Sequence, residues 1–374
     1  MKSLLAIADD LTGAAEIAAI GHRAGWRAEV LTRWSEPGEG ALTVLDTDTR
    51  LSPPDVAART LAAVGRSIAA GASGFVFKKT DSVLRGPVLA EVSALAAALG
   101  RRTVLLLPAN PSLGRVIREG RYFVNDVPLH ETAFARDPHH PVHTADVAAL
   151  LGGGATVSVR TPDQDLPATG IIVGAVASSA DVTAWARRLD GSMLAAGGRD
   201  FFAAALRAHG LVRDGADNTF CPARPTLFIR GSLASPTRAD DILALPPRAV
   251  AGDEGALDRW IEHVVIALGT EGFVAVSCAR SDQPNAPARI RAAYAELVRH
   301  AVHSHAVRHV LVEGGATASA ILNLLGWHRL AVAREWVPGV ATLRPAAEEK
   351  IAVTMKPGSY VWPEELWSHV TTAR

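Results

Sequence analysis

The sequence is poor in cysteine and has no long apolar run. Its two cysteines, Cys221 and Cys278, stand far apart in 374 residues, which excludes a disulfide framework and a thiolate metal site and favours a reducing compartment. The apolar run over residues 4–8 is shorter than a signal-peptide core, and no stretch reaches the ~18 apolar residues of a membrane span. These absences predict a cytoplasmic protein.

The formal net charge of the chain is zero. The 38 basic and 38 acidic residues balance, whereas proteins that bind nucleic acid or anionic membranes usually have an excess of positive charge. We therefore expect a small-molecule partner, with neither nucleic acid nor a membrane involved. Lysine supplies only five of the 38 basic residues, so Lys78, Lys79 and Lys356, which lie beside motif-like segments, attract interest.

The familiar glycine-rich nucleotide motifs are also absent. None of the lysines follows a glycine, which excludes a Walker A motif, and neither Gly-x-Gly pair continues to Gly-x-Gly-x-x-Gly. P-loop kinases and ordinary dinucleotide enzymes are therefore disfavoured.

Short apolar runs, typical of buried parallel strands, alternate with alanine-rich segments of helical spacing. We expect strands at 4–8, 28–32, 42–46, 75–79, 103–107, 156–160 and 171–176, and helices at 12–24, 53–70 and across 181–208. Residues 120–141 differ, and an Asn125-Asp126 turn predicts a hairpin or flap there. Alternation of β and α predicts a doubly wound α/β fold.

The length of the chain predicts two domains. Residues 212–225 lack periodicity and contain Asp, Gly, Asn and Pro, which indicates a linker, and a new series of strands follows at 226–230, 273–278 and 310–313. We predict an N-terminal domain at 1–215 and a C-terminal domain at 226–374. Both are expected to be doubly wound α/β domains, with a cleft between them.

Polar residues follow the expected strands of the first domain, where ligands of open α/β sheets bind. Asp9 and Asp10 follow the first strand, and Thr12 is the expected cap of the next helix. Because successive residues of a strand point to opposite sides, we expect Asp10 to face the crevice and Asp9 to bind into the turn. Residues 78–86 place two lysines, Asp81, Ser82 and Arg85 before another helix, a setting that suits a carboxylate or phosphate.

Glycines stand at the corresponding turns of the second domain. They occur in Arg230-Gly231-Ser232, in Glu313-Gly314-Gly315-Ala316-Thr317 and in Pro338-Gly339-Val340, while Pro236-Thr237-Arg238 marks an expected helix start. Such turns let backbone N–H groups approach a phosphate closely.

In their order along the chain, segments 9–13, 78–86, 108–115 and 127–138 resemble the signature segments of the four-carbon acid sugar kinases, formerly domain of unknown function 1537. The glycine turns resemble the family's C-terminal nucleotide-binding domain. Two segments depart from the family pattern: Lys356-Pro357-Gly358-Ser359-Tyr360 stands where Lys-Ser-Gly and then Asn-Phe-Gly are usual, and Gly174 stands where an Asp commonly ends a strand.

The resemblance implies an ATP-dependent kinase that phosphorylates a four-carbon sugar acid of the threonate, erythronate or 3-oxo-tetronate type. It places the acid in the first domain and ATP in the second, with Mg²⁺ bridging the phosphates. Arg85 and Lys79 would bind the carboxylate, and either Asp10 or Asp81 would accept the proton of the attacking hydroxyl. The residues implied for the acid are Asp9, Arg50, Lys79, Ser82 and Arg85. The residues implied for the nucleotide are Ser232, Gly314, Gly315, Ala316, Thr317, Gly339 and Gly358. No protein ligand of a metal is assigned, and a homodimer is left open.

Two other functions stay open. Residues 44–49 match the pattern of haloacid-dehalogenase-like phosphatases, in which Asp46 would be the nucleophile, although this strand is third rather than first. A non-catalytic sugar-acid-binding protein could use the same residues without turnover. His130, His139, His140 and His143 lack metal-site spacing and are expected to be solvated flap residues.

Overall fold

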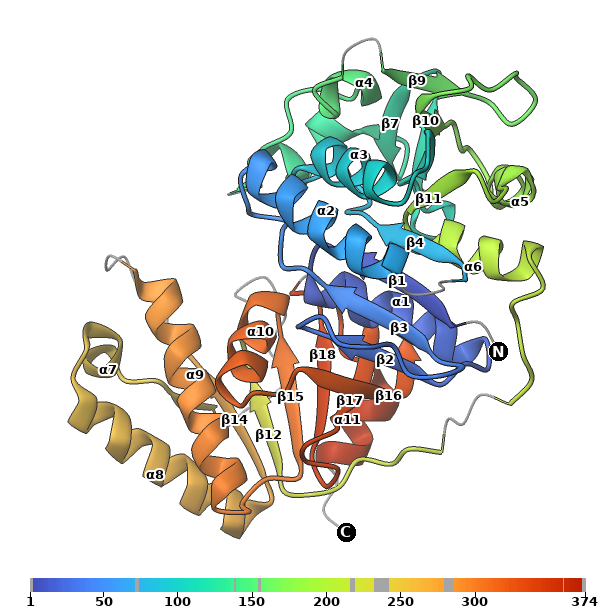
Figure 1. Cartoon of the computed structure of the whole chain (residues 1–374). Coiled ribbons are helices and arrows are strands. Elements are labelled where there is room, and N and C mark those ends of the chain that lie inside the picture. The colour runs from blue at the N-terminus through green and yellow to red at the C-terminus, as the bar shows by residue number, and fades with distance from the viewer. Residues whose placement is uncertain are drawn as a thin grey trace. The chain divides into compact units, whose positions relative to one another are not determined.

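The computed structural model describes residues 3–70, 74–137, 139–153, 156–215, 219–231, 242–278, 285–358 and 360–371. The chain forms two compact units (Figure 1). The N-terminal unit comprises residues 1–28 and 33–216, and the C-terminal unit comprises residues 29–32 and 217–374. Both are α/β units with largely parallel sheets, which confirms the predicted fold class.

The N-terminal sheet is parallel, with strand order β3-β1-β4-β11-β5-β10-β9. Its strands are β1 (Leu4–Ala8), β3 (Leu42–Asp46), β4 (Val76–Lys79), β5 (Thr103–Leu107), β9 (Val157–Arg160), β10 (Gly170–Gly174) and β11 (Met193–Gly197). Every residue of β1, β3 and β5 is buried, as expected for strands covered by helices on both faces.

Helices cover the two faces of this sheet in separate groups. The helices are α1 (Leu11–Arg23), α2 (Pro54–Ala70), α3 (Val88–Ala98), α4 (Val147–Leu150), α5 (Ser179–Arg188) and α6 (Arg199–Ala208). Helix α2 packs against α3, whereas α6 packs against both α1 and α5 (Figure 1). This is a doubly wound arrangement, and it leaves the carboxyl ends of β1, β3 and β4 free to carry side chains for a ligand.

The prediction of continuous helix across 181–208 was wrong. The structure breaks this region into α5, β11 and α6, with β11 lying between β4 and β5 in the middle of the sheet. The sequence of β11, Met-Leu-Ala-Ala-Gly, is small and alanine-rich, so its local propensity favours a helix, and burial in the sheet overrides that propensity. The signal that could have been used is the Asp190-Gly191 turn before it.

A small antiparallel sheet forms the predicted flap. It comprises β6 (Arg115–Arg118), β7 (Arg121–Val124) and β8 (Val127–Pro128). Asn125 and Asp126 both have positive φ, 49° and 64°, which is the two-residue turn that Asn-Asp favours and which confirms the hairpin. Strand β6 was not predicted. Short 3-10 helices η1 (Pro111–Leu113), η2 (Leu129–Glu131) and η3 (Ala133–Arg136) flank the flap.

The C-terminal sheet has the order β13-β14-β12-β15-β18-β17-β16-β2. Strands β12 (Thr226–Ile229), β13 (Ile242–Ala244), β14 (Phe273–Ser277), β15 (His309–Glu313) and β18 (Ala352–Lys356) are parallel. Strands β16 (Arg329–Val337), β17 (Val340–Pro345) and β2 (Ala28–Leu31) extend the sheet in antiparallel fashion. Strands β16 and β17 were not predicted. Strand β2 was expected at residues 28–32, but as part of the N-terminal domain, and it pairs instead with β16.

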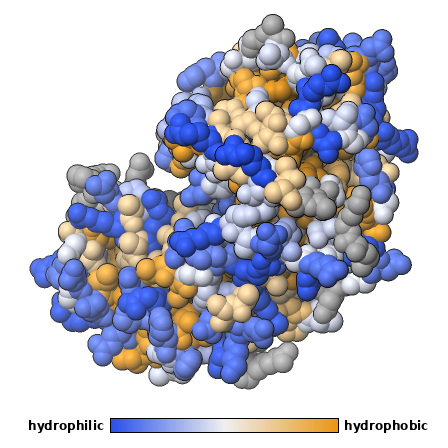
Figure 2. Space-filling view, viewed as in Figure 1, coloured by the Kyte–Doolittle hydropathy of each residue, from blue (hydrophilic) through white to orange (hydrophobic). Residues whose placement is uncertain are grey.

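Helices α7 (Pro247–Ala251), α8 (Glu254–Glu271), α9 (Ala286–His303), α10 (Gly315–Leu324) and α11 (Glu364–Thr371) complete the C-terminal unit. Its core includes Phe228, Leu311, Trp336 and Trp362. Among the described residues, no helix combines the length and the apolar character needed to cross a bilayer. On the face drawn in Figure 2, hydrophilic and hydrophobic residues are interspersed.

Candidate functional site

The side chains that follow β1, β3 and β4 converge in the N-terminal unit. Arg50 donates from Nε to Asp9 Oδ2 at 2.8 Å and from Nη1 to Asp10 Oδ2 at 2.7 Å. Its Nη2 lies 2.9 Å from the Oδ1 atom of both aspartates. One guanidinium therefore holds two neighbouring carboxylates in a fixed, fork-like geometry.

This arrangement corrects two expectations about the aspartates. Asp9 and Asp10 do not point apart, because β1 ends at Ala8 and the alternation of a strand does not extend to them. Asp10, not Thr12, caps α1: Asp10 Oδ1 accepts from Gly13 N at 2.9 Å, and Thr12 Oγ1 donates to Asp10 Oδ2 at 2.6 Å. The Asp10 carboxylate thus both caps α1 and pairs with Arg50.

Burial and charge act in opposite directions on the pKa values here. Burial favours a raised pKa at Asp9, but Arg50 and Lys78 outweigh it and the pKa is lowered. Asp46, at the end of β3, has no such cation: burial raises its pKa, the nearby Asp10 and Asp48 add to this, and the result lies well above the ordinary value. The described hydrogen bond to Asp46 comes from Asp48 N at 2.9 Å. Asp9 is thus held ionised, whereas Asp46 is held toward its neutral form.

A second arginine cluster follows β4. Arg85 donates from Nε to Asp81 Oδ2 at 3.0 Å and from Nη2 to Asp81 Oδ1 at 2.8 Å, and from Nη1 to Asp137 Oδ2 at 2.9 Å. Burial opposes ionisation of Asp81, but the charges of Arg50 and Arg85 prevail and hold its pKa far below the ordinary value. Asp81 is therefore held ionised, and its side chain is 6% exposed against 21% for Asp10, so it is the less accessible of the two carboxylates.

The two neighbouring lysines have different surroundings. Lys78 is fully buried and its Nζ lies 3.0 Å from Glu91 Oε2 of α3, so it is a structural ion pair. Lys79 Nζ lies 3.6 Å from Glu16 Oε2 of α1. A Cβ atom at Gly13 would lie 2.7 Å from Asp10 Oδ1 and 3.3 Å from Lys79 Nζ, so the glycine permits the close approach of the lysine to the start of α1.

Ser82 connects this cluster to the flap. Arg115 Nη1 donates to Ser82 Oγ, and the Tyr122 hydroxyl donates to the Ser82 carbonyl. His140 Nε2 lies 3.2 Å from the Arg50 carbonyl, so this histidine contacts the site and is not merely a solvated flap residue. The sequence-based site omitted Arg115 and Asp137, although both lie within the quoted signature segments.

In the C-terminal unit, the turn from β15 to α10 is built on glycine. Gly314 has φ 92° and ψ 130°, and as the residue preceding α10 it offers no side-chain cap, so the first N–H groups, at Gly315, Ala316 and Thr317, lack that partner. A Cβ at Gly231 would lie 2.3 Å from the Glu313 carbonyl oxygen. The two turns therefore approach each other closely, and an uncapped helix start of this kind suits a phosphate.

Beside this turn lies a buried ion pair. Lys356 Nζ is 3.3 Å from Glu313 Oε1, which also accepts a hydrogen bond from Trp362 Nε1 at 2.9 Å. Burial lowers the pKa of Lys356, and Glu313 offsets part of that effect. Lys356 Nζ also lies 3.4 Å from the Gly358 carbonyl.

The remaining predicted nucleotide residues are placed as follows. Gly339 lies in the turn between β16 and β17 with φ 82°, and a Cβ there would lie 2.6 Å from Tyr360 Cε2. Ser232, segment 236–238 and Ser359 lie outside the described residues. The structure thus brings Gly314–Thr317, Gly231 and the Lys356–Gly358 segment together, and sets Gly339 against Tyr360.

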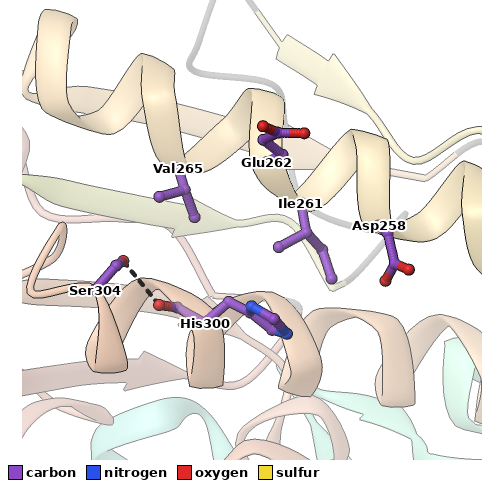
Figure 3. A pocket seen from close by; sticks show the side chains of 6 residues that line it. All are labelled: Asp258, Ile261, Glu262, Val265, His300 and Ser304. Atoms are coloured by element: carbon purple, nitrogen blue, oxygen red, sulfur yellow. Dashed lines mark hydrogen bonds between the residues drawn. The ribbon is translucent and has the colours of Figure 1, made fainter.

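A separate pocket of about 390 Å³ lies between α8 and α9 (Figure 3). Its lining residues are Asp258, Ile261, Glu262, Val265, His300 and Ser304. Ser304 Oγ donates to the His300 carbonyl at 2.8 Å, a bond internal to α9 and the residue after it. None of the signature segments contributes to this pocket, so the strand-end clusters are the stronger candidates.

Comparison with known proteins separates the same two regions. A sugar-binding N-terminal domain matches residues 4–190 and a nucleotide-binding C-terminal domain matches residues 234–360. A D-threonate kinase of Cupriavidus necator is 32% identical over 380 residues, which cover 90% of this chain and 89% of that protein. The chain belongs to the four-carbon acid sugar kinase family. The aspartate–arginine cluster falls within the family's sugar-binding domain, and the Gly314 turn falls within its nucleotide-binding domain.

Other members of the family align over different lengths. The D-threonate kinase of Salmonella typhimurium is 36% identical over 151 residues, which cover 40% of this chain and only 36% of that protein. The 3-oxo-tetronate kinase of Methylobacterium radiotolerans is 26% identical over 95% of both chains. The crystal structure of a Salmonella typhimurium LT2 protein shares the fold, with a TM-score of 0.80 at 17% identity over 98% of both chains.

Proposed function

We propose that this protein is a kinase that transfers the γ-phosphoryl group of ATP to a hydroxyl of a four-carbon sugar acid. The observation that carries the proposal is the alignment with a D-threonate kinase along nearly the whole chain. The two clusters support it, because phosphoryl transfer requires positioning and charge neutralisation more than covalent chemistry by the protein. One cluster offers fixed charges for a small ionised substrate, and the other offers backbone N–H groups for phosphates.

The acid site is assigned to the N-terminal cluster, with Asp9, Arg50, Lys79, Ser82 and Arg85 as its substrate-binding residues. Of the three carboxylates, Asp10 is the most exposed, with 21% of its side chain accessible against 1% for Asp9 and 6% for Asp81. A proton acceptor must reach the attacking hydroxyl. Asp10 is therefore the proposed base, and Asp81 is proposed to hold Arg85.

The nucleotide site is assigned to the Gly314 turn. ATP would be held through the N–H groups of Gly315, Ala316 and Thr317, with Gly231 and Gly358 nearby. Among the described residues, no group of three potential protein ligands could hold a metal ion. Mg²⁺, which commonly binds through one or two carboxylates together with substrate phosphates, would therefore be held mainly by the nucleotide, where it neutralises phosphate charge.

The burial of Asp46, which is 5% exposed, does not favour the phosphatase hypothesis. An aspartate nucleophile must be ionised, and the buried Asp46 has a raised pKa. A purely binding protein would bind a sugar acid without forming ADP.

The test is an ADP-release assay of the purified full chain with ATP, Mg²⁺ and D-threonate, D-erythronate or 3-oxo-tetronate. We expect ADP formation that depends on one or more of these acids and none with the neutral polyol D-threitol. Folded protein that forms no acid-dependent ADP would overturn the kinase. Release of phosphate from a phosphoester without ATP would support the phosphatase instead.

A further inference from the structure

Most cations around the N-terminal strand ends already have carboxylate partners. Arg50 is paired with Asp9 and Asp10, and Arg85 with Asp81 and Asp137. The lysines are similarly matched, Lys78 with Glu91 and Lys79 with Glu16. An incoming carboxylate must therefore compete with an existing anion at each of these groups.

Arg115 lies on the flap and contacts the turn after β4. It is the first residue of β6 and shares a face of that strand with Ile117, because side chains alternate along a strand. Ile117 and its cross-strand neighbour Tyr122 are both fully buried, so this face packs inward. Tyr122 and Arg115 both donate hydrogen bonds to Ser82, in the turn that carries Asp81. Arg115 is thus directed at the proposed acid site.

Unlike its neighbours, Arg115 makes no ion pair with a carboxylate in the part of the chain that the structure describes. Its guanidinium carbon lies 5.8 Å from the centre of the Phe134 ring, and that of Arg85 lies 5.4 Å from the same ring. The two arginines therefore share one aromatic platform, but only Arg85 is neutralised by aspartates. A guanidinium held by a ring and one hydroxyl keeps donors for a planar, bidentate anion.

We propose that Arg115 binds the carboxylate of the sugar acid and selects an acid over a neutral analogue. This inference rests on the proposed function. It revises the sequence-based assignment, in which Arg85 and Lys79 bind the carboxylate, by giving that contact to Arg115. In this arrangement Arg85, Asp81 and Asp137 hold the turn and the flap, while Phe134 and Ser82 orient Arg115 toward the substrate.

Arg118 supplies a matched control. It lies on the opposite face of the same strand, 45% exposed, where its guanidinium carbon is 4.8 Å from the centre of the Phe123 ring and its Nη2 is 2.8 Å from Asp126 Oδ1. Arg115→Gln removes the charge from the inner face of β6. Arg115→Lys keeps the charge but loses the planar pair of guanidinium donors. Arg118→Gln removes a charge from the outer face.

The experiment compares these variants with the parent by calorimetric binding of D-threonate, by KM for D-threonate in the ADP assay, and by competitive inhibition with the neutral amide D-threonamide. We expect Arg115→Gln to weaken D-threonate binding and raise its KM about 10- to 100-fold, with Arg115→Lys intermediate. Inhibition by D-threonamide should change less than about twofold, since no charged contact is lost. Arg118→Gln should leave all three values unchanged.

The outcomes separate the two proposals. An unchanged D-threonate affinity in Arg115→Gln, or an equal loss for acid and amide, would overturn the role of Arg115 alone. D-threonate binding that depends on Arg115 without any ADP formation would overturn the kinase alone, and a parent that binds no tetronate would overturn both. Should Arg115→Gln fail to fold, as shown by its melting curve, Arg115→Lys is used instead: it should still weaken D-threonate more than D-threonamide, and an equal effect on the two would overturn the role of Arg115.

Discussion

The two strand-end regions are built in opposite ways. In the N-terminal unit, Asp9, Asp10 and Asp81 are fixed by Arg50 and Arg85 through hydrogen bonds of 2.7 to 3.0 Å. In the C-terminal unit, the turn at Gly314 presents a helix start without a side-chain cap, and the ion pair beside it, Glu313–Lys356, is buried. Charges set in advance suit a small ion whose hydroxyl must be aligned, whereas backbone N–H groups suit phosphates.

The difference also concerns what a substitution removes. A side chain of the first region belongs to a network of charges, so the cost of removing it depends on what its partners keep. Loss of the Asp81 charge deprives Arg85 of its more buried carboxylate, which is destabilising, whereas loss of the Asp10 charge leaves Arg50 paired with Asp9. A glycine of the second region supplies a backbone conformation, so a substitution there changes geometry without changing charge.

The largest effect is expected for Asp10→Asn. Asn caps a helix about as well as Asp, so the melting temperature should change little, while kcat should fall by ~10²–10⁴-fold if Asp10 is the base. Asp81→Asn should instead lower stability and raise KM for the acid, because Arg85 loses its buried partner. Steady-state kinetics and melting curves of both variants decide this. A kcat loss below ~10-fold at Asp10, with a large loss at Asp81, would assign the base to the turn after β4.

The next effect concerns the second region. Gly314→Ala forces a side chain into a conformation with φ 92°, which costs ~1–3 kcal/mol of strain and displaces the start of α10. Calorimetry should show ADP affinity reduced about 10- to 100-fold with D-threonate binding unchanged. Gly326 is the control: it follows the other end of α10, also has positive φ, and also has open space around it. If Gly326→Ala weakens ADP binding equally, the turn at Gly314 has no special role.

A smaller effect should appear as a pH dependence of the C-terminal unit. His309 is fully buried and desolvation lowers its pKa from 6.5 to about 3, while its Nε2 lies 2.7 Å from Thr354 Oγ1. Between these pH values the unfolded chain takes up a proton at His309 that the folded chain does not. The contribution of neutral His309 to the free energy of unfolding is therefore fully present above pH 6.5 and is lost as the pH falls toward 3.

From pH 7.5 to pH 5.5, the proton uptake at His309 should lower the free energy of unfolding by about 1.4 kcal/mol. Urea unfolding at the two pH values should show His309→Gln with a smaller pH dependence by that amount. His303→Gln, at an exposed position at the end of α9, should behave like the parent. An identical pH dependence in His309→Gln and the parent would show that His309 is not held neutral.

The smallest effect is expected for Asp46→Asn. The pKa of Asp46 is raised in the folded chain. Its favourable contribution to the free energy of unfolding is therefore complete below the pKa in the unfolded chain, about 3.9, and is lost as the pH rises through the raised value. At pH 8 the neutral amide should match the parent or exceed its stability by up to ~1 kcal/mol, with kinase activity within about threefold. Unfolding and ADP assays at pH 8 check this. Complete loss of ADP formation would contradict this prediction and would show that phosphoryl transfer requires the Asp46 carboxylate.

Several elements were determined by the sequence itself. Strands β1, β3 and β5 have the boundaries expected from their apolar runs, because a strand buried on both faces must be apolar throughout. The polar residues that follow β1, β3 and β4 also come together, as their position after parallel strands predicted. Strands β11 and β16 to β18 were not predicted; β11 was missed because a short alanine-rich segment fits a helix as well as a strand.

The pairing of the charged side chains was decided only by the tertiary structure. Lys78 and Lys79 are adjacent in the sequence, and only Lys79 was assigned to the substrate; neighbouring residues at the end of β4 point to opposite faces of the sheet. Lys78 consequently meets Glu91 of α3, and Lys79 meets Glu16 of α1. Likewise, the pairing of Arg85 with Asp137 and the absence of a carboxylate partner for Arg115 among the described residues follow from the folding of the flap over the turn after β4. Contacts such as Arg115–Ser82 and Arg85–Asp137, which join residues 33 and 52 positions apart, depend on how the helices and strands pack, which no local pattern encodes.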